Sequence, residues 1–201
     1  MRDRYVRDFV NSGVLVDKFI GDMHEALKDV YDFEHIFGRS YKLVDTSTDT
    51  RVVYPAAFNG NKEYVSLLPN DNYGSFAFFD IYDSQKNVSK VPSSPKIEIN
   101  GAVVMWLVLD DDKNKEYLST EVIKERALKV LSSSHYLTNG SIEITELYEQ
   151  PENIYKGYSL EHLYSSGFTT NSNIGKLDRQ MFMYPYYALR IEFRAVVKAL
   201  C

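Results

Sequence analysis

The segment GAVVMWLVL, residues 101–109, places the strictest limit on what this chain can fold into. From Val103 to Leu109 every residue is apolar, so a strand formed here has to be buried on both of its faces. Three aspartates follow directly and end the run, which is far shorter than the roughly 18 apolar residues that a transmembrane helix needs. The segment therefore predicts the central strand of a covered sheet and no membrane span.

Helical periodicity occurs in two places. In residues 14–37 apolar side chains recur at intervals of three and four residues, and Gly38 provides a natural stop. The positions are Val16, Ile20, Met23, Leu27, Val30 and Tyr31. The segment STEVIKERALKVLSS, residues 119–133, offers Ser119 or Thr120 as an N-cap and repeats this spacing. Two amphipathic helices are therefore predicted, one of them close to the N-terminus.

Most of the remaining segments follow the two-residue period of strands. They are YKLVD, TRVVYPAAF, EYVSLL, SFAFFDIY, SIEITELYE, ENIYKGYSL and a closing strand from about Tyr187 to Val197. In the closing strand apolar and charged residues alternate from Leu189 to Ala195, which is the pattern of a half-buried strand. A sheet with one polar face at this strand is the expected result.

The order of these segments is helix, strands, helix, strands. It defines an α+β fold with a mainly antiparallel sheet, an N-terminal amphipathic helix and a second helix packed on the sheet. The polar segment YSSGFTTNSNIGKLDRQ, residues 164–180, is a long connection of a kind that is uncommon inside a compact domain and is usually functional or disordered. We predict a single α+β domain over residues 1–201, with extended loops at about 59–74 and 159–182.

The sequence contains no motif for catalysis or cofactor binding. The nucleophile elbow, the phosphate-binding glycine loops and paired metal-ligating histidines are all missing, and Cys201 is the single cysteine. His24, beside Met23 on the first predicted helix, is interpreted as a surface or boundary residue. The chain is therefore predicted not to be an enzyme and to have no catalytic, cofactor-binding or metal-binding residues.

The segment DDDKNKEYLSTE, residues 110–121, comes closest to a metal site. Its acidic residues approach the oxygen spacing of a calcium loop. Lys115, however, stands where such a loop needs glycine for its sharp turn, and the preceding segment is a predicted strand where an EF-hand has a helix. We interpret the segment as a solvated turn between a strand and a helix.

The chain carries a net charge of −5, from 23 basic and 28 acidic residues. General nucleic-acid binders need a surplus of Lys and Arg to displace the counterions of phosphates. The charge balance therefore disfavours that class of protein, and we expect weak binding to duplex DNA without sequence preference.

Aromatic residues are frequent, with 16 tyrosines and 11 phenylalanines. Tyrosine joins a large apolar ring to a polar hydroxyl and suits surfaces that become interfaces. Ordinary packing along a sheet is an equally open interpretation, and a platform for carbohydrate or stacked bases is a third. The residues predicted to form a subunit interface lie in the long loop and in the approach to the closing strand: Tyr164, Phe168, Tyr184, Tyr186 and Tyr187.

An amphipathic helix, the strand NGAVVMWLVLD leading into the helix STEVIKERALKVL, and the closing strand YPYYALRIEF follow one another along this chain. This layout resembles that of the tail-terminator and neck-ring proteins of tailed bacteriophages, which are structural components of the head-tail connector. The resemblance covers roughly residues 14–37 and 97–197 and rests on the layout of the segments.

The resemblance implies a non-enzymatic virion protein, made in the host cell cytoplasm, that forms a homo-oligomeric ring around the DNA channel. Its neighbours would be portal, neck or tail proteins, and DNA would pass through the ring without specific binding. The acidic balance agrees with a lumen that does not hold phosphates. The open alternative is a monomeric α+β binding module that recognises a protein or a ligand with its long Tyr-rich loops.

Overall fold

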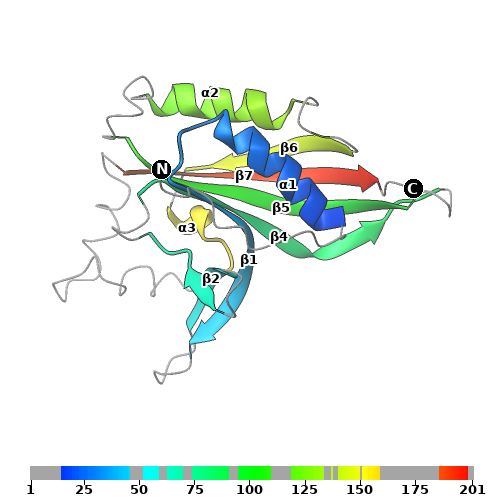
Figure 1. Cartoon of the computed structure of the whole chain (residues 1–201), viewed down its shortest axis with the longest axis horizontal. Coiled ribbons are helices and arrows are strands. Elements are labelled where there is room, and N and C mark those ends of the chain that lie inside the picture. The colour runs from blue at the N-terminus through cyan, green and yellow to red at the C-terminus, as the bar shows by residue number, and fades with distance from the viewer. Residues whose placement is uncertain are drawn as a thin grey trace.

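The computed structural model describes residues 15–45, 52–58, 63–69, 74–90, 95–109, 119–133, 137, 140–149, 151–158 and 186–198. Three helices and seven strands follow one another in these stretches (Figure 1). In chain order they are α1 (Leu15–Lys28), β1 (His35–Asp45), β2 (Val52–Phe58), β3 (Tyr64–Ser66), β4 (Phe76–Asn87), β5 (Lys96–Val108), α2 (Thr120–Leu131), β6 (Gly140–Tyr148), α3 (Pro151–Ile154) and β7 (Tyr186–Lys198).

The strands form one sheet in the order β3-β2-β1-β4-β5-β7-β6. Every neighbouring pair is antiparallel except β1 and β4, which are parallel. The pairing of β5 with β7 runs the whole length of both strands, from Lys96 opposite Lys198 to Val108 opposite Tyr186. The predicted α+β fold with a mainly antiparallel sheet is confirmed.

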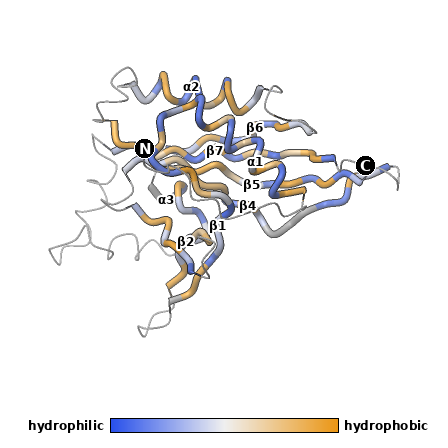
Figure 2. The backbone as a smooth tube through the Cα atoms, viewed as in Figure 1, coloured by the Kyte–Doolittle hydropathy of each residue, from blue (hydrophilic) through white to orange (hydrophobic). Residues whose placement is uncertain are grey.

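Helices α1 and α2 cover one face of the sheet (Figure 1). Apolar residues recur among polar ones along both helices (Figure 2), and the apolar side of each helix packs on the sheet. The main core lies between these layers, where the ring of Phe19 from α1 is 5.2 Å from that of Phe193 from β7. Among the described residues no helix is long and apolar enough to cross a bilayer.

The opposite face of the sheet has a second, smaller core. Val104 and Trp106 of β5 pack there with Tyr155, which lies in the turn after α3. The hydroxyl of Tyr155 donates a hydrogen bond to the carbonyl of Leu67, just beyond β3, at 3.0 Å. Because Val103 is buried in the main core and Val104 in the second one, β5 is buried on both faces, as its sequence predicts.

Strand β1 belongs to the main sheet over only part of its length. Residues 35–39 pair with β4, and residues 40–45 pair with β2. An irregularity in the register lies between Ile36 and Arg39. Residues 39–45 together with β2 and β3 bend away from the other strands, and we call them the β-arm (Figure 1).

The first helix is shorter than predicted, so the prediction of a helix over residues 14–37 is wrong at its C-terminal end. Helix α1 ends at Lys28, and Gly38, predicted to stop the helix, is buried inside β1. The backbone amide of Glu34 donates to the carbonyl of Ser75 at 2.8 Å, at the entrance to the parallel pair of β1 and β4. Pairing with the sheet therefore outweighs the helical spacing, which continues as far as Tyr31.

The segment ENIYKGYSL, predicted as a strand, forms no strand in its described part. Helix α3 occupies Pro151–Ile154, and a turn follows as far as Tyr158. Proline suits the first position of a helix because its missing amide hydrogen has no partner there in any case. Gly157 has a φ of 85°, a left-handed conformation that interrupts an extended chain.

The structure describes part of one predicted loop and nothing of the other. The loop at about 59–74 contains β3, and residues 59–62 and 70–73 lie outside the described residues. The loop at 159–182 lies wholly outside them.

Candidate functional site

The closing strand carries a charged residue in the interior of the protein. Leu189 and Ile191 of β7 point into the main core, so Arg190 between them points to the opposite face of the sheet. That face was expected to be polar and half-buried. Arg190 is instead fully buried, with 0% of its surface exposed, and Glu192 is buried beside it.

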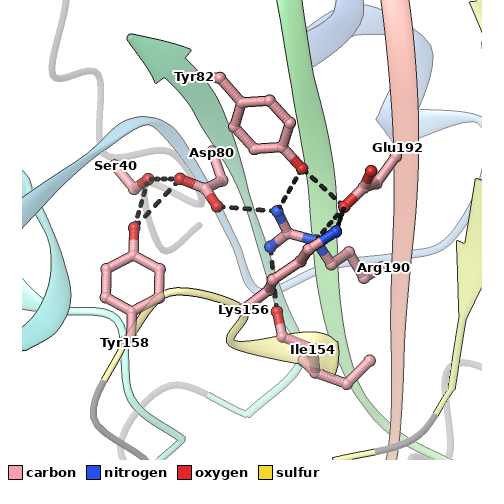
Figure 3. A network of polar contacts seen from close by, with 8 residues as sticks. All are labelled: Ser40, Asp80, Tyr82, Ile154, Lys156, Tyr158, Arg190 and Glu192. Carbon is pink, nitrogen blue, oxygen red and sulfur yellow. Dashed lines mark hydrogen bonds and ion pairs between the residues drawn. The ribbon is translucent and has the colours of Figure 1, made fainter. Parts of the chain in front are cut away.

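Arg190 donates hydrogen bonds to four different groups (Figure 3). Its Nη2 lies 3.0 Å from Oδ2 of Asp80 and 2.8 Å from the hydroxyl of Tyr82. Its Nη1 donates to the carbonyl of Ile154 at 3.2 Å, and its Nε to Oε1 of Glu192 at 3.3 Å. One guanidinium group therefore connects β4, α3 and β7.

The two carboxylates around Arg190 have further donors. Oδ1 of Asp80 accepts hydrogen bonds from the hydroxyl of Tyr158 at 3.1 Å and from Oγ of Ser40 at 3.3 Å. Oε1 of Glu192 accepts from the hydroxyl of Tyr82 at 2.7 Å and from Nζ of Lys156 at 3.3 Å. We call this group the Arg190 network; its members are Ser40, Asp80, Tyr82, Ile154, Lys156, Tyr158, Arg190 and Glu192.

The charges of the Arg190 network balance. Two carboxylates, Asp80 and Glu192, face two cations, Arg190 and Lys156. Buried charges are tolerated when they are paired and hydrogen-bonded. Removing one partner leaves the other charge buried without compensation, which lowers the stability of the fold strongly. The network therefore holds the 151–158 segment and Ser40 of β1 against β4 and β7.

The pKa values within the network follow from this pairing. Burial opposes the ionisation of Glu192, but the hydrogen bonds from Tyr82 and Lys156 and the charge of Arg190 outweigh it and lower its pKa. Burial, together with the hydrogen bond to Glu192, raises the pKa of Tyr82 to about 12. Burial and the nearby charge of Asp80 also raise the pKa of Tyr158. Both tyrosines are therefore neutral hydrogen-bond donors at physiological pH.

We expect the free energy of unfolding to fall as the pH rises from about 10 to about 12. An unfolded tyrosine ionises near pH 10, whereas folded Tyr82 keeps its proton up to about pH 12, so over this window the unfolded state loses protons first and is favoured. Urea unfolding at a series of pH values, followed by circular dichroism, measures the slope. The Tyr82→Phe variant cannot ionise at this position and should show a shallower slope; equal slopes for both proteins would contradict the prediction.

The predicted interface residues fall into two groups. Tyr164, Phe168 and Tyr184 lie outside the described residues. Tyr187 is buried on the helix side of β7 and donates a hydrogen bond to Glu149 at 2.7 Å. Its ring is thus already covered within one chain.

Tyr186, at the first position of β7, is half-buried on the opposite face of the sheet. Its ring centroid lies 6.3 Å from that of Trp106. The structure therefore places the two described members of the predicted interface on different faces of the sheet. The assignment of all five residues to a subunit interface stays a prediction.

His24 is buried, and the interpretation of this residue as a surface or boundary residue is wrong. Its Nε2 lies 3.1 Å from the carbonyl oxygen of Ile36, at the start of β1. The ring thus links α1 to the sheet. Within the described part of the chain no group of three or more His, Cys, Asp or Glu residues is placed to hold a metal ion. Residues 110–118, which hold most of the calcium-like segment, lie outside that part.

The periodicity of the sequence does not predict the Arg190 network. One signal was available, because Asp80 interrupts the otherwise apolar and aromatic run FAFFDIY of β4. A carboxylate in a buried strand needs a cation. No protein-family model, curated protein or solved structure matches this chain.

Proposed function

We propose that this protein is a non-enzymatic structural subunit of a bacteriophage virion, and that it forms a ring in the neck or tail around the DNA channel. The observation that carries the proposal is the arrangement of the elements. Helices α1 and α2 lie on one face of a sheet in which the long strand β5 pairs with the closing strand β7. This is the layout on which the resemblance to tail-terminator and neck-ring proteins rests.

The Arg190 network supports a structural role. A ring repeats the same contact at every subunit, so each subunit has to keep one shape. The network contributes to this because its charges are compensated within one chain and its contacts fix the 151–158 segment to β4 and β7. As a ring component the protein would be made in the host cytoplasm and carried in the virion. It would contact portal, neck or tail proteins, and DNA would pass through without specific binding.

Electron microscopy tests the proposal most directly. Virions of the phage that encodes the chain, labelled with an antibody against it, should carry the label at the neck or tail. Size-exclusion chromatography with light scattering should also detect species larger than a monomer at high protein concentration. Unlabelled virions would contradict the proposal. A strictly monomeric protein that binds a separate protein or ligand would favour the alternative, a binding module.

A further inference from the structure

The end of the sheet at which β7 finishes is rich in lysine (Figure 1). The described parts of three stretches meet there: residues 84–97, which run from the end of β4 into β5, residues 132–142, which lead into β6, and residues 193–201. In a chain with 28 acidic residues, these stretches contain no Asp or Glu. We call their five basic residues the lysine tip: Lys86, Lys90, Lys96, Arg194 and Lys198.

The strand pairing places most of the lysine tip on one face of the sheet. Lys96 lies opposite Lys198, and Lys86 lies opposite Glu98. Residues directly opposite one another in an antiparallel pair share a face, and so do alternate residues of one strand. Four members of the tip are therefore on the face that points away from α1 and α2: Lys86, Lys96, Arg194 and Lys198.

Two carboxylates accompany the five cations of the lysine tip. Glu98 is 6% exposed and accepts a hydrogen bond from Nη2 of Arg194 at 2.7 Å. Glu143 of β6 is exposed and also lies opposite Arg194. Five cations against two carboxylates leave a surplus of positive charge at the tip, although the whole chain carries a net charge of −5. Farther along the same face, the charges of the Arg190 network balance.

The pair of Lys96 and Lys198 is unfavourable for the isolated protein. Like charges directly opposite one another in a strand pair repel and lower the stability of the sheet. A bound anion over this pair removes the repulsion. The exposed Lys86 and Lys90 lie at the end of β4 next to this pair, so a polyanion can contact several cations at once.

The composition of the lysine tip favours DNA over a protein as the polyanion. The centres of protein interfaces are depleted in lysine and enriched in aromatic residues. The exposed tyrosines of the described residues, Tyr41 and Tyr64, lie on the β-arm, and near the tip only Val88 is large, apolar and exposed. Duplex DNA instead presents closely spaced phosphates, to which lysine binds as a point charge.

We propose that the lysine tip contacts the phosphate backbone of duplex DNA without reading its sequence. The proposal rests on the ring function, in which it names the surface of the subunit that faces the DNA channel. Phosphate contacts carry no sequence information and allow a protein to slide along DNA. Such a contact therefore agrees with DNA that passes through the ring without specific binding.

Fluorescence anisotropy of a labelled duplex, titrated with the wild-type protein at several salt concentrations, measures the contact. In low salt, at about 20 mM NaCl, we expect a dissociation constant of about 1–100 μM, as for nonspecific binding. The logarithm of the binding constant should fall with the logarithm of the salt concentration with a slope of about −3 to −4, because each phosphate contact contributes about −0.9. No binding in low salt up to about 1 mM protein would overturn the proposal.

A matched pair of variants tests the location of the contact. The tip variant combines Lys86→Gln with Lys198→Gln and should bind at least about fivefold more weakly in low salt, with a slope shallower by about 2. The control variant combines Lys28→Gln with Lys42→Gln, which removes the same charge from α1 and the β-arm, and should bind as the wild type does. Equal weakening in the two variants would mean that binding follows the net charge, and would overturn the proposal.

Circular dichroism establishes that both variants fold. If the tip variant does not fold, Lys90→Gln decides in its place, because this residue lies outside the strands. The single substitution should make the slope shallower by about 1. An unchanged slope would overturn the proposal.

Further probes distinguish DNA from other anionic partners. Duplexes of equal length and different sequence should bind equally, and a clear preference for one sequence would refute contact with the backbone alone. Polyglutamate and vesicles that contain phosphatidylserine should bind more weakly than the duplex at an equal concentration of negative charge. Stronger binding of polyglutamate would identify an acidic protein as the partner, stronger binding of the vesicles would identify a membrane surface, and either result would overturn the proposal.

The fate of the ring function is read separately. Labelled virions together with a wild-type protein that does not bind the duplex would leave the ring function standing and refute the DNA contact. Conversely, a duplex contact that the tip variant weakens, together with unlabelled virions, would leave the contact standing and refute the virion function.

Discussion

Replacing Arg190 with methionine is expected to lower the free energy of unfolding by about 3–5 kcal/mol. The substitution leaves Asp80 and Glu192 in the protein interior without their common cation and takes a hydrogen-bond donor from the carbonyl of Ile154. Methionine has nearly the length of the arginine stem and leaves little empty volume. The loss of stability therefore measures the missing charge and its hydrogen bonds more than the effect of a cavity. Urea unfolding followed by circular dichroism gives the difference.

Arg194→Met is the matched control for this substitution. Arg194 lies on the same strand and the same face as Arg190 and pairs with Glu98 at 2.7 Å, but about half of its side chain is exposed. Glu98 is buried, with 8% of its side chain exposed, but water reaches the guanidinium of Arg194, so Arg194→Met should cost clearly less than Arg190→Met. Losses of similar size in the two variants would contradict the view that burial makes the Arg190 network important.

The pH dependence of the Arg190→Met variant provides a second check. In the wild-type protein the lowered pKa of Glu192 stabilises the fold at neutral pH, and this contribution is lost as the pH falls through the folded-state pKa. In the variant the same carboxylate has lost the cation that favours its ionised form, so protonation relieves a buried charge. The stability difference between the two proteins should therefore narrow toward pH of about 4, near the ordinary carboxyl pKa. A constant difference would argue against an electrostatic origin.

Phe193→Ala is expected to destabilise the protein by about 3–5 kcal/mol, the range for removing a buried aromatic ring. Phe193 is 2% exposed and its ring packs against Phe19 of α1. A side chain at Gly101 on the neighbouring strand would come within 3.2 Å of this ring, so the glycine makes room for it. Phe193→Leu keeps most of the volume and should cost clearly less, which thermal or urea unfolding can establish.

Phe58→Ala offers a contrast with Phe193→Ala. Phe58 lies on β2 in the β-arm, where its ring centroid is 5.4 Å from that of Tyr64, and it is only half-buried. Its removal should cost less stability than that of Phe193, because water already reaches part of the ring in the folded protein. Equal destabilisation by Phe58→Ala and Phe193→Ala, measured by urea unfolding, would mean that the Phe58 ring contributes to stability as a core residue does.

Segments whose pattern is long and unambiguous could be predicted from the sequence. The apolar run of β5 and the alternation in β7 each predict a strand over many residues, and both strands form. The half-buried polar face predicted for β7 is wrong around Arg190 and Glu192, which are buried. The end of α1 could not be predicted, because Val30 and Tyr31 continue the helical spacing beyond Lys28. The strand that begins at His35 forms because it pairs with β4. Local periodicity contains no information about such a distant partner.

The Arg190 network shows the same limit more strongly. Asp80 and Tyr82 precede Arg190 by 110 and 108 positions in the sequence. In β7 itself, Arg190 and Arg194 occupy equivalent places in the alternation, yet one is fully buried and the other exposed. The difference arises because α3 and the turn after it cover the sheet at Arg190. The pattern of residues 152–160 predicts a strand, so it does not indicate this cover. Without the correct form of that segment the buried cation could not be recognised.

The position of β7 has a consequence for the synthesis of the protein. This strand follows all the other described strands in the chain, yet it lies between β5 and β6 in the sheet. Until β7 has left the ribosome, β5 lacks its β7 partner, and β6 lacks the one described strand with which it pairs. The nascent chain therefore has to stay free of premature association, with apolar strand residues exposed, until residues 186–198 have left the ribosome. Chains released early would be substrates for chaperones and proteases, since long-range pairing of this kind is slow and aggregation-prone.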